Sequence, residues 1–163
     1  MGYIFGSGTK FVALTSGLAV LMTLPVSAVG ANQTAVAPAV TATIDIAISN
    51  LRSEKGDVLV CLSSNPKYFP DCRKDKTARK MKVAASDAAN VQFTNVEPGT
   101  YAVALVHDEN ANGKMDLRLF LPREGFGFSR NPKIGMGPPK FKSAQFTIGA
   151  DNVNYAVKMK YIL

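Results

Sequence analysis

The strongest constraint on the fold is a period-two alternation of apolar with polar or small residues, which recurs along most of the chain. Alternation of this kind places successive side chains on opposite faces of a half-buried strand. Helical patterns are few and no internal repeat is present. The pattern therefore predicts an all-β fold, an antiparallel β-sandwich of about seven strands with long Gly-, Pro- and aromatic-rich loops. The alternating stretches are 43–49, 58–62, 91–96, 101–106, 146–148 and 155–161.

Three of these stretches set expectations for the topology. Stretches 43–49 and 58–62 flank a turn, RSEKG at 52–56, and are predicted to pair as a hairpin. In 101–106 both faces are apolar or small, which predicts a central strand covered on both sides. This strand leads directly into His107 and Asp108.

The N-terminus has the features of a secretory signal peptide. Lys10 precedes the mostly apolar stretch 11–24, and the small residues that follow offer cleavage sites near Ala28 or Ala31. The apolar stretch is short for a membrane span, which needs about 20 residues. We therefore expect 1–31 to be a signal peptide, 32–42 a flexible lead-in and 43–163 a single β-sandwich domain, exported to the periplasm or the extracellular space.

The chain is basic, and its cations are concentrated in one segment. The formal net charge is +7, and loss of the signal peptide, which holds one Lys and no acid, reduces it to +6. Such a domain can adhere to an anionic cell-envelope component, and another exported protein is the alternative partner. Six basic residues lie within 73–82 without interleaved aromatic residues, so nucleic acid is not expected as a partner. This segment is interpreted either as an anion-binding patch or, as we favour, as a solvated loop that protects a sheet edge.

Cys61 and Cys72 are the only cysteines. In an oxidising compartment they are expected to form one disulfide, which would contribute roughly 2–3 kcal/mol through the loop that it closes. No C-x-x-C pair is present, and no cluster of His or Cys completes a zinc site, so a redox or metal role is disfavoured. Cys61 would lie on the strand face opposite Val60 and Leu62.

The stretch 107–129 carries the densest set of oxygen-bearing side chains in the chain. It includes D-x-N-x-N-G-x-x-D, the first nine positions of a calcium loop. In such a loop positions 1, 3 and 5 converge, Gly at position 6 permits the turn, position 7 offers a backbone carbonyl, and position 9 binds directly or through water. The candidate ligands are therefore Asp108, Asn110, Asn112, the carbonyl of Lys114, and Asp116.

Position 12 is the weak point of this hypothesis, because a bidentate Glu belongs there and this chain has Leu119. Glu124 can return to supply the missing carboxylate. With only two acidic residues in the motif, we expect calcium as a weakly bound cofactor at best, with a Kd of about 10⁻⁴–10⁻³ M. The alternative is a turn that Asn, Asp and Gly form without any ion.

The stretch 120–139 is rich in Gly, Pro and aromatic residues and is too long for an ordinary connector. Phe120, Phe126 and Phe128 are expected to cover an open end of the sheet. An envelope-binding module that uses the basic segment 73–82 or the aromatic loop 120–141 is our alternative interpretation of the function. Its candidate ligand surface comprises Arg73, Lys74, Lys76, Phe126, Phe128 and Phe141.

A hydrolase with His107, Asp108 and Glu124 as acid–base groups is a third interpretation. No nucleophile elbow, zinc signature or phosphate loop is present. A lone His at a strand end is more often a hydrogen-bonded structural residue than a catalyst. We therefore expect a non-catalytic protein, because no complete catalytic site can be assembled from the sequence.

Four motifs follow one another along the chain: PGTY at 98–101, HDENANGKMD at 107–116, PREGFGFS at 122–129 and GPPKF at 137–141. In this order and spacing they resemble a bacterial family of exported proteins, domain of unknown function 2141, over about 44–161. The resemblance implies no assigned activity. The PGTY turn also resembles that of transthyretin-like and carboxypeptidase-regulatory-like domains, which implies an immunoglobulin- or transthyretin-like sandwich. The chain departs from the family at 119–121, LFL, where relatives often have Gly.

Overall fold

Ten strands form the framework of the computed structural model, which describes residues 39–135 and 137–163. The predicted signal peptide and residues 32–38 of the predicted lead-in lie outside the described residues. The described residues belong to one compact unit, Ala37–Leu163. The strands are β1 (Ala42–Ser49), β2 (Asp57–Ser63), β3 (Arg79–Ala84), β4 (Asn90–Val96), β5 (Gly99–Asp108), β6 (Leu117–Arg118), β7 (Leu121–Pro122), β8 (Gly125–Phe128), β9 (Phe146–Ile148) and β10 (Val153–Lys158), and the short helices are η1 (Cys72–Lys74), η2 (Ala85–Asp87) and α1 (Phe141–Ala144).

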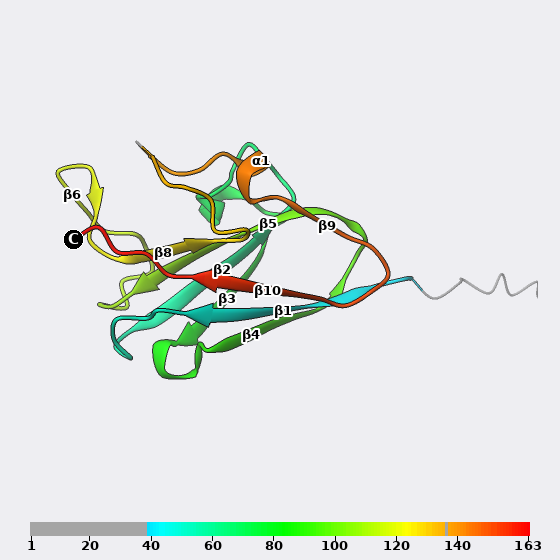
Figure 1. Cartoon of the computed structure of the whole chain (residues 1–163), viewed down its shortest axis with the longest axis horizontal. Helices are drawn as coiled ribbons and strands as arrows, with labels where there is room; N and C mark the ends of the chain where they lie inside the picture. The colour runs from blue at the N-terminus through cyan, green and yellow to red at the C-terminus, as the bar shows by residue number, and fades with distance from the viewer. Residues whose placement is uncertain (1–38, 136) are drawn as a thin grey trace, which may run out of the picture. The chain divides into compact units, whose positions relative to one another are not determined.

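The strands form the two layers of a β-sandwich (Figure 1). One sheet has the order β10-β1-β4, and the other has the order β3-β2-β5-β8, with β9 pairing with the start of β5. β6 and β7 form a separate two-stranded ribbon. The prediction of an all-β sandwich is confirmed. One pairing departs from the expected antiparallel pattern, because β1 and β10 run parallel.

Alternate residues of both sheets fill the interior between the layers. Ile44 and Ile46 of β1 and Val103 and Leu105 of β5 are each at most 1% exposed in this core. Burying one such side chain contributes roughly 1.5–3 kcal/mol. Ala104, on the other face of β5, is also buried. The prediction that 101–106 is a central strand covered on both faces is therefore confirmed.

The predicted hairpin between 43–49 and 58–62 is wrong. β1 pairs with β4 and β10, whereas β2 pairs with β3 and β5 in the other sheet. The turn at 52–56 carries the chain from one layer to the other, so the apolar faces of β1 and β2 meet across the shared core instead of the two strands lying side by side. Two boundaries also differ from the prediction. Ala42, expected in the lead-in, is 2% exposed and begins β1, and residues 79–82, expected to be irregular, belong to the edge strand β3.

A second apolar cluster covers the outer face of the larger sheet at β5 and β8. Phe126 and Phe128 belong to β8 and pack there with Phe69 and Phe141, so they cover the outer face of the sheet and not the open end that was expected. Phe120 does not, because it is 94% exposed on the β6–β7 ribbon, and that part of the prediction is wrong. Among the described residues, the structure contains no helix long and apolar enough to cross a membrane.

Candidate metal site at the end of strand β5

Two buried polar residues end the central strand β5. His107 and Asp108 are both fully buried, and as neighbours in a strand they point to opposite faces of the sheet. The loop 109–124 follows, includes the β6–β7 ribbon, and returns the chain to β8, which pairs with β5. Each of the two residues begins a separate polar cluster.

The carboxylate of Asp108 closes the loop by accepting backbone hydrogen bonds. Its Oδ1 accepts from the N–H of Asn112 at 3.0 Å, and its Oδ2 accepts from the N–H of Gly113 at 2.6 Å. Gly113 has a φ of +80°, and nothing lies within 4 Å of the position that a Cβ would take, so the requirement for Gly is conformational. The turn lies at position 6 of the motif, where a calcium loop has it.

The carboxylate of Asp116 faces the amides of the two asparagines. Its Oδ2 accepts from Nδ2 of Asn110 at 2.8 Å and from Nδ2 of Asn112 at 2.9 Å. These two hydrogen bonds, that of Asn110 first, lower the pKa of Asp116 because they stabilise its charged form. The amide oxygens are used elsewhere: Oδ1 of Asn110 accepts from the N–H of Asn112, and Oδ1 of Asn112 accepts from the N–H of Lys114.

Glu124 lies directly before β8, and its side chain turns back to the loop. Its Oε2 accepts from the N–H of Asp116 at 3.0 Å. Its side chain is buried at 4% exposure, and Oε1 has no hydrogen-bond partner among the described residues. Burial raises the pKa of Glu124, and the charges of Asp108 and Asp116 raise it further. The N–H of Asp116 favours the charged form of Glu124, but burial and the neighbouring carboxylates outweigh it, and the protonated form can donate a hydrogen bond to Asp108.

The loop brings the predicted ligands together without completing a cage. Within residues 39–135 and 137–163, no group of three or more His, Cys, Asp or Glu side chains is arranged to hold a metal ion in this conformation. Asn110 and Asn112 direct amide nitrogens, not oxygens, at Asp116. An ion at this point would replace those two hydrogen bonds, and rotation of each amide would present its oxygen instead. The ammonium of Lys114 lies 3.9 Å from Oδ1 of Asp116.

The cluster that begins at His107 was not predicted from the sequence. His107 Nε2 lies 3.0 Å from the carbonyl oxygen of Lys55, so this nitrogen must carry the proton and donate. Nδ1 then accepts from the hydroxyl of Tyr161 at 2.8 Å. The same hydroxyl accepts from the N–H of Arg52 at 3.1 Å. Both ring nitrogens are engaged, and the ring is inaccessible to a substrate in this conformation.

Arg52 extends this cluster toward the loop. Its Nε donates to Oε2 of Glu109 at 2.9 Å, and its guanidinium lies over the ring of Tyr161 at 4.6 Å. Ser53 Oγ donates to the other oxygen of Glu109 at 2.8 Å. The hydrogen bond from Arg52 is the largest cause of the lowered pKa of Glu109. No local signal in the sequence could have revealed these partners, because they lie more than fifty positions apart.

The disulfide between Cys61 and Cys72 is present, with the two Cα atoms 6.4 Å apart. It ties the segment that begins the basic stretch to the larger sheet. Every one of the six basic side chains in 73–82 is exposed. Two of them are paired with acids: Arg73 with Asp71 at 2.8 Å and Lys82 with Asp57 at 3.0 Å. The exposed residues of the predicted ligand surface in this stretch are Arg73, Lys74 and Lys76.

The aromatic half of the predicted ligand surface is not exposed. Phe126, Phe128 and Phe141 are 6%, 7% and 8% exposed, because they form the second apolar cluster. A ligand cannot contact their ring faces in this conformation, so the expectation that they form a surface is corrected. The exposed aromatic residue of the loop 120–141 is instead Phe120.

Comparison with known protein families matches residues 46–156 to the family described as "Uncharacterized protein conserved in bacteria (DUF2141)". This is the family that the four sequence motifs resemble. No curated protein and no solved structure matches the chain. The transthyretin-like subtype therefore stays a prediction, and the function has to be argued from the site.

Proposed function

This chain belongs to the DUF2141 family, and from that premise we propose that it is an exported, non-catalytic β-sandwich protein that binds calcium weakly in the loop 108–124 and thereby orders the surface that the loop carries. The observation that carries the proposal is the buried Oε1 of Glu124, which has no partner among the described residues. A buried charged oxygen is costly unless a cation or a donor compensates it. A divalent cation beside Asp108 and Asp116 supplies that compensation.

The ligand chemistry fits calcium. The candidate ligands are all oxygens, from carboxylates, side-chain amides and one backbone carbonyl, which a hard cation with six to eight ligands prefers. Glu124 takes the place of the Glu that Leu119 fails to provide at position 12. The proposed set is Asp108, Asn110, Asn112, the carbonyl of Lys114, Asp116 and Glu124.

Export is supported by two features that are independent of the loop. The N-terminal sequence has the charge, apolar stretch and small residues of a signal peptide. The chain also carries a disulfide, which persists in oxidising compartments such as the periplasm. The protein is therefore proposed to act outside the cytoplasm, where millimolar calcium can occupy a weak site.

Thermal unfolding of the exported protein, measured with and without millimolar calcium, tests the proposal. An ion that binds only the native state adds about 1.4 kcal/mol of stability when its free concentration is about ten times Kd. We expect calcium to raise the Tm by a few degrees and magnesium to raise it less. Asp108→Ala should abolish the gain. If calcium does not change the Tm of the wild-type protein, the proposed site is rejected.

Two further variants protect this test against a simple loss of folding. Asp108 also accepts two backbone hydrogen bonds, so Asp116→Asn is the milder change, since it removes a charge and keeps the shape. Asp116→Asn should fold and lose the calcium gain. Asp87→Ala removes an exposed carboxylate in η2 and should keep the full gain. Equal gains in the two variants would show that calcium acts on surface charge and not at the loop.

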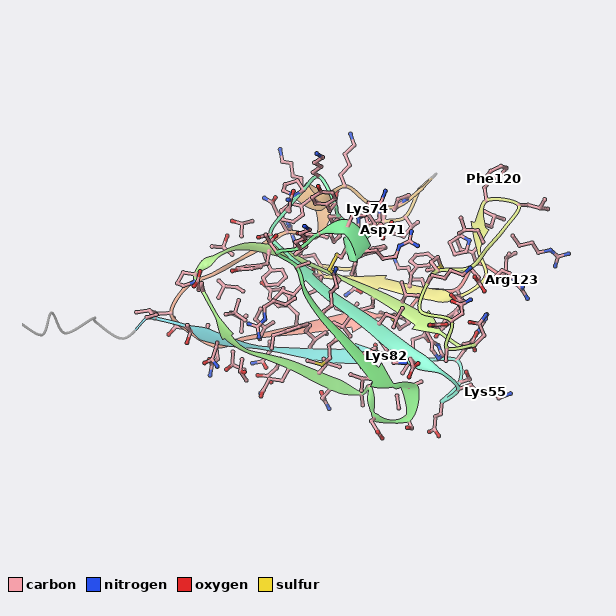
Figure 2. The ribbon with its side chains drawn as sticks, turned by 180° about the vertical axis from the view of Figure 1, so that it is seen from behind. Lys55, Asp71, Lys74, Lys82, Phe120 and Arg123 are labelled. Atoms are coloured by element: carbon pink, nitrogen blue, oxygen red, sulfur yellow. A yellow bond between two sulfur atoms is a disulfide. The ribbon has the colours of Figure 1, made fainter. Side chains whose placement is uncertain are left out.

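A second candidate function is favoured by one observation, the exposure of all six basic residues in 73–82. These residues lie on η1, on edge strand β3 and on the segment between them. Figure 2 shows Lys74 on η1 and Lys82 on β3. An anionic polymer or lipid of the cell envelope is the partner that such a surface would attract. The same cations also protect an edge strand from pairing with another chain, which is the simpler account.

A further inference from the structure

The β6–β7 ribbon carries an exposed apolar tip. Leu119 and Phe120 are 85% and 94% exposed, and the flanking Leu117 and Leu121 are 59% and 44% exposed. These four are more than half of the large apolar side chains exposed in the part of the chain that the structure describes. Figure 2 shows Phe120 at the end of the ribbon, pointing away from the sheets. A group of exposed apolar side chains marks a surface for contact with a membrane or a protein.

The stability of the turn does not account for this tip. Leu119 and Phe120 connect β6 to β7 with φ values of +49° and +67°. A two-residue turn with positive φ favours Asn and Gly, and bulky side chains are strained in this region. The two residues therefore satisfy neither the local preference of the turn nor the preference of apolar side chains for burial.

The C-terminus adds to the same apolar end. Arg52 donates to the carbonyl oxygens of Arg123 at 3.0 Å and of Leu163 at 2.6 Å, so the last residues lie beside the base of the ribbon. Ile162 and Leu163 are 47% and 49% exposed. Figure 1 shows the C-terminus and β6 at one end of the sandwich and the beginning of β1 at the other.

Three basic residues lie in the loop and the ribbon that carry the tip. All three are exposed: Lys114, Arg118 and Arg123. Figure 2 shows Arg123 near the ribbon. The N–H of Arg123 donates to the carbonyl of Asp116 at 3.0 Å, which fixes the ribbon to the candidate metal site. These three cations balance the three carboxylates of that site, so the formal charge here is near zero. One calcium ion adds two positive charges.

We propose that the tip, Leu117 to Leu121, inserts into a lipid bilayer that contains anionic lipid, and that calcium in the neighbouring loop strengthens the attachment. The calcium dependence rests on the proposed function, whereas the insertion of the tip does not. A membrane fits this surface better than a protein partner. A stable protein interface needs about 800 Å² on each side, but apolar insertion with basic side chains at the headgroups needs no complementary surface.

A fluorescent reporter at the tip tests the insertion directly. The chain contains no Trp, so Phe120→Trp introduces a single tryptophan, which can be excited apart from the five tyrosines. The exported protein is mixed with vesicles of phosphatidylglycerol and phosphatidylcholine, or of phosphatidylcholine alone, with calcium or with a chelator. We expect a blue shift and quenching by brominated lipid with the anionic vesicles, strongest with calcium. An emission spectrum that no vesicle changes would overturn the proposal and direct the search to a protein partner.

Lys74→Trp is the matched control, because it places the same reporter on the exposed basic segment. Figure 2 shows Lys74 on η1, away from Phe120. It should show a smaller blue shift than Phe120→Trp and no quenching by brominated lipid, because a segment held at the headgroups by its charge stays outside the apolar layer. A shift at Lys74→Trp without one at Phe120→Trp would assign membrane binding to the basic segment and overturn the proposal.

Loss of apolar side chains gives a second readout. Phe120→Ser or Leu119→Ser should weaken vesicle binding about tenfold or more, since each removes a buried apolar side chain from the bound state. Val40→Ser should have no effect, because Val40 is 58% exposed but precedes β1 at the opposite end of the sandwich. Equal weakening in all three variants would overturn insertion at the tip.

The calcium shift of the Tm, measured without lipid, separates the two proposals. A Tm shift without a tryptophan shift leaves the metal site standing and rejects insertion. Conversely, calcium can leave both the tryptophan shift and the Tm unchanged. That result supports insertion and rejects the metal site.

Discussion

The two polar clusters at the end of β5 differ in whether their hydrogen bonds are complete. In the cluster of His107, both ring nitrogens have partners, and the hydroxyl of Tyr161 both donates and accepts. In the loop, Asp108 and Asp116 are well bonded, but Glu124 has one buried oxygen without a partner among the described residues. Buried polar groups that satisfy one another stabilise a fold, whereas a buried carboxylate oxygen without a partner favours either protonation or an added cation.

The two clusters also differ in how the charge of their glutamate is compensated. Glu109 has a lowered pKa because Arg52 donates to it, and Glu124 has a raised pKa because it is buried beside like charges. Both side chains lie near the same strand end. The first is compensated by the protein itself, and we infer that the second is compensated by calcium.

The largest expected effect comes from breaking the satisfied cluster. His107→Ala removes a fully buried ring and leaves the carbonyl of Lys55 and the hydroxyl of Tyr161 without their partner. We expect the free energy of unfolding to fall by about 2–4 kcal/mol, both with and without calcium. Urea denaturation in the two conditions measures it.

The milder variant Tyr161→Phe serves as the control, since it removes one hydroxyl and should cost about 1 kcal/mol. In both variants the increment of stability from calcium should equal that of the wild type. An increment that disappeared in Tyr161→Phe would show that the two clusters act as one.

A smaller effect, of opposite sign, is expected at the unsatisfied cluster. Glu124→Gln removes the buried charge, keeps an oxygen to accept from the N–H of Asp116, and offers an N–H to the neighbouring Asp108. We expect the calcium-free protein to become more stable by about 1 kcal/mol at neutral pH. Calcium should then add nothing. Thermal unfolding with and without calcium measures both changes, and a less stable variant that still responds to calcium would contradict the assignment.

The smallest effect is a dependence on pH. Because the pKa of Glu124 is raised, the calcium-free fold favours the protonated side chain. Protonated Glu124 therefore contributes to stability below its ordinary pKa of 4.5, and this contribution is lost as the pH rises through the raised pKa. Calcium binds the carboxylate, so the increment from calcium should grow over the same interval. Glu109 behaves in the opposite way, because its pKa is lowered: its contribution is lost only as the pH falls below the ordinary range.

Melting temperatures measured with and without calcium, from below pH 4.5 to neutrality, test this. Glu124→Gln should abolish the pH-dependent increment and leave the acid-side loss of stability in place. A calcium increment that did not change with pH would exclude Glu124 as a ligand.

Features encoded by neighbouring residues were predicted correctly from the sequence. The period of two determines which side chains of a strand are buried, so the sandwich and the central strand β5 follow from it. The turn at Gly113 also follows, because Asp108 closes it with hydrogen bonds that span only four and five positions. The disulfide between the only two cysteines of the chain was also predicted, on the expectation of an oxidising compartment.

Contacts between residues that are distant in sequence could not be predicted, because they form only when the sheets pack together. Whether β1 pairs with β2 or with β10 depends on how the two sheets share one core, and the wrong hairpin shows that chain proximity does not settle it. The same holds for His107 and Tyr161, which are 54 positions apart, and for Arg52 and Leu163, which are 111 apart. Local preferences determine only the alternation of apolar residues along a strand and the positions of the turns. Side chains become buried only when the two layers pack, and the unpaired oxygen of Glu124 is a result of that packing.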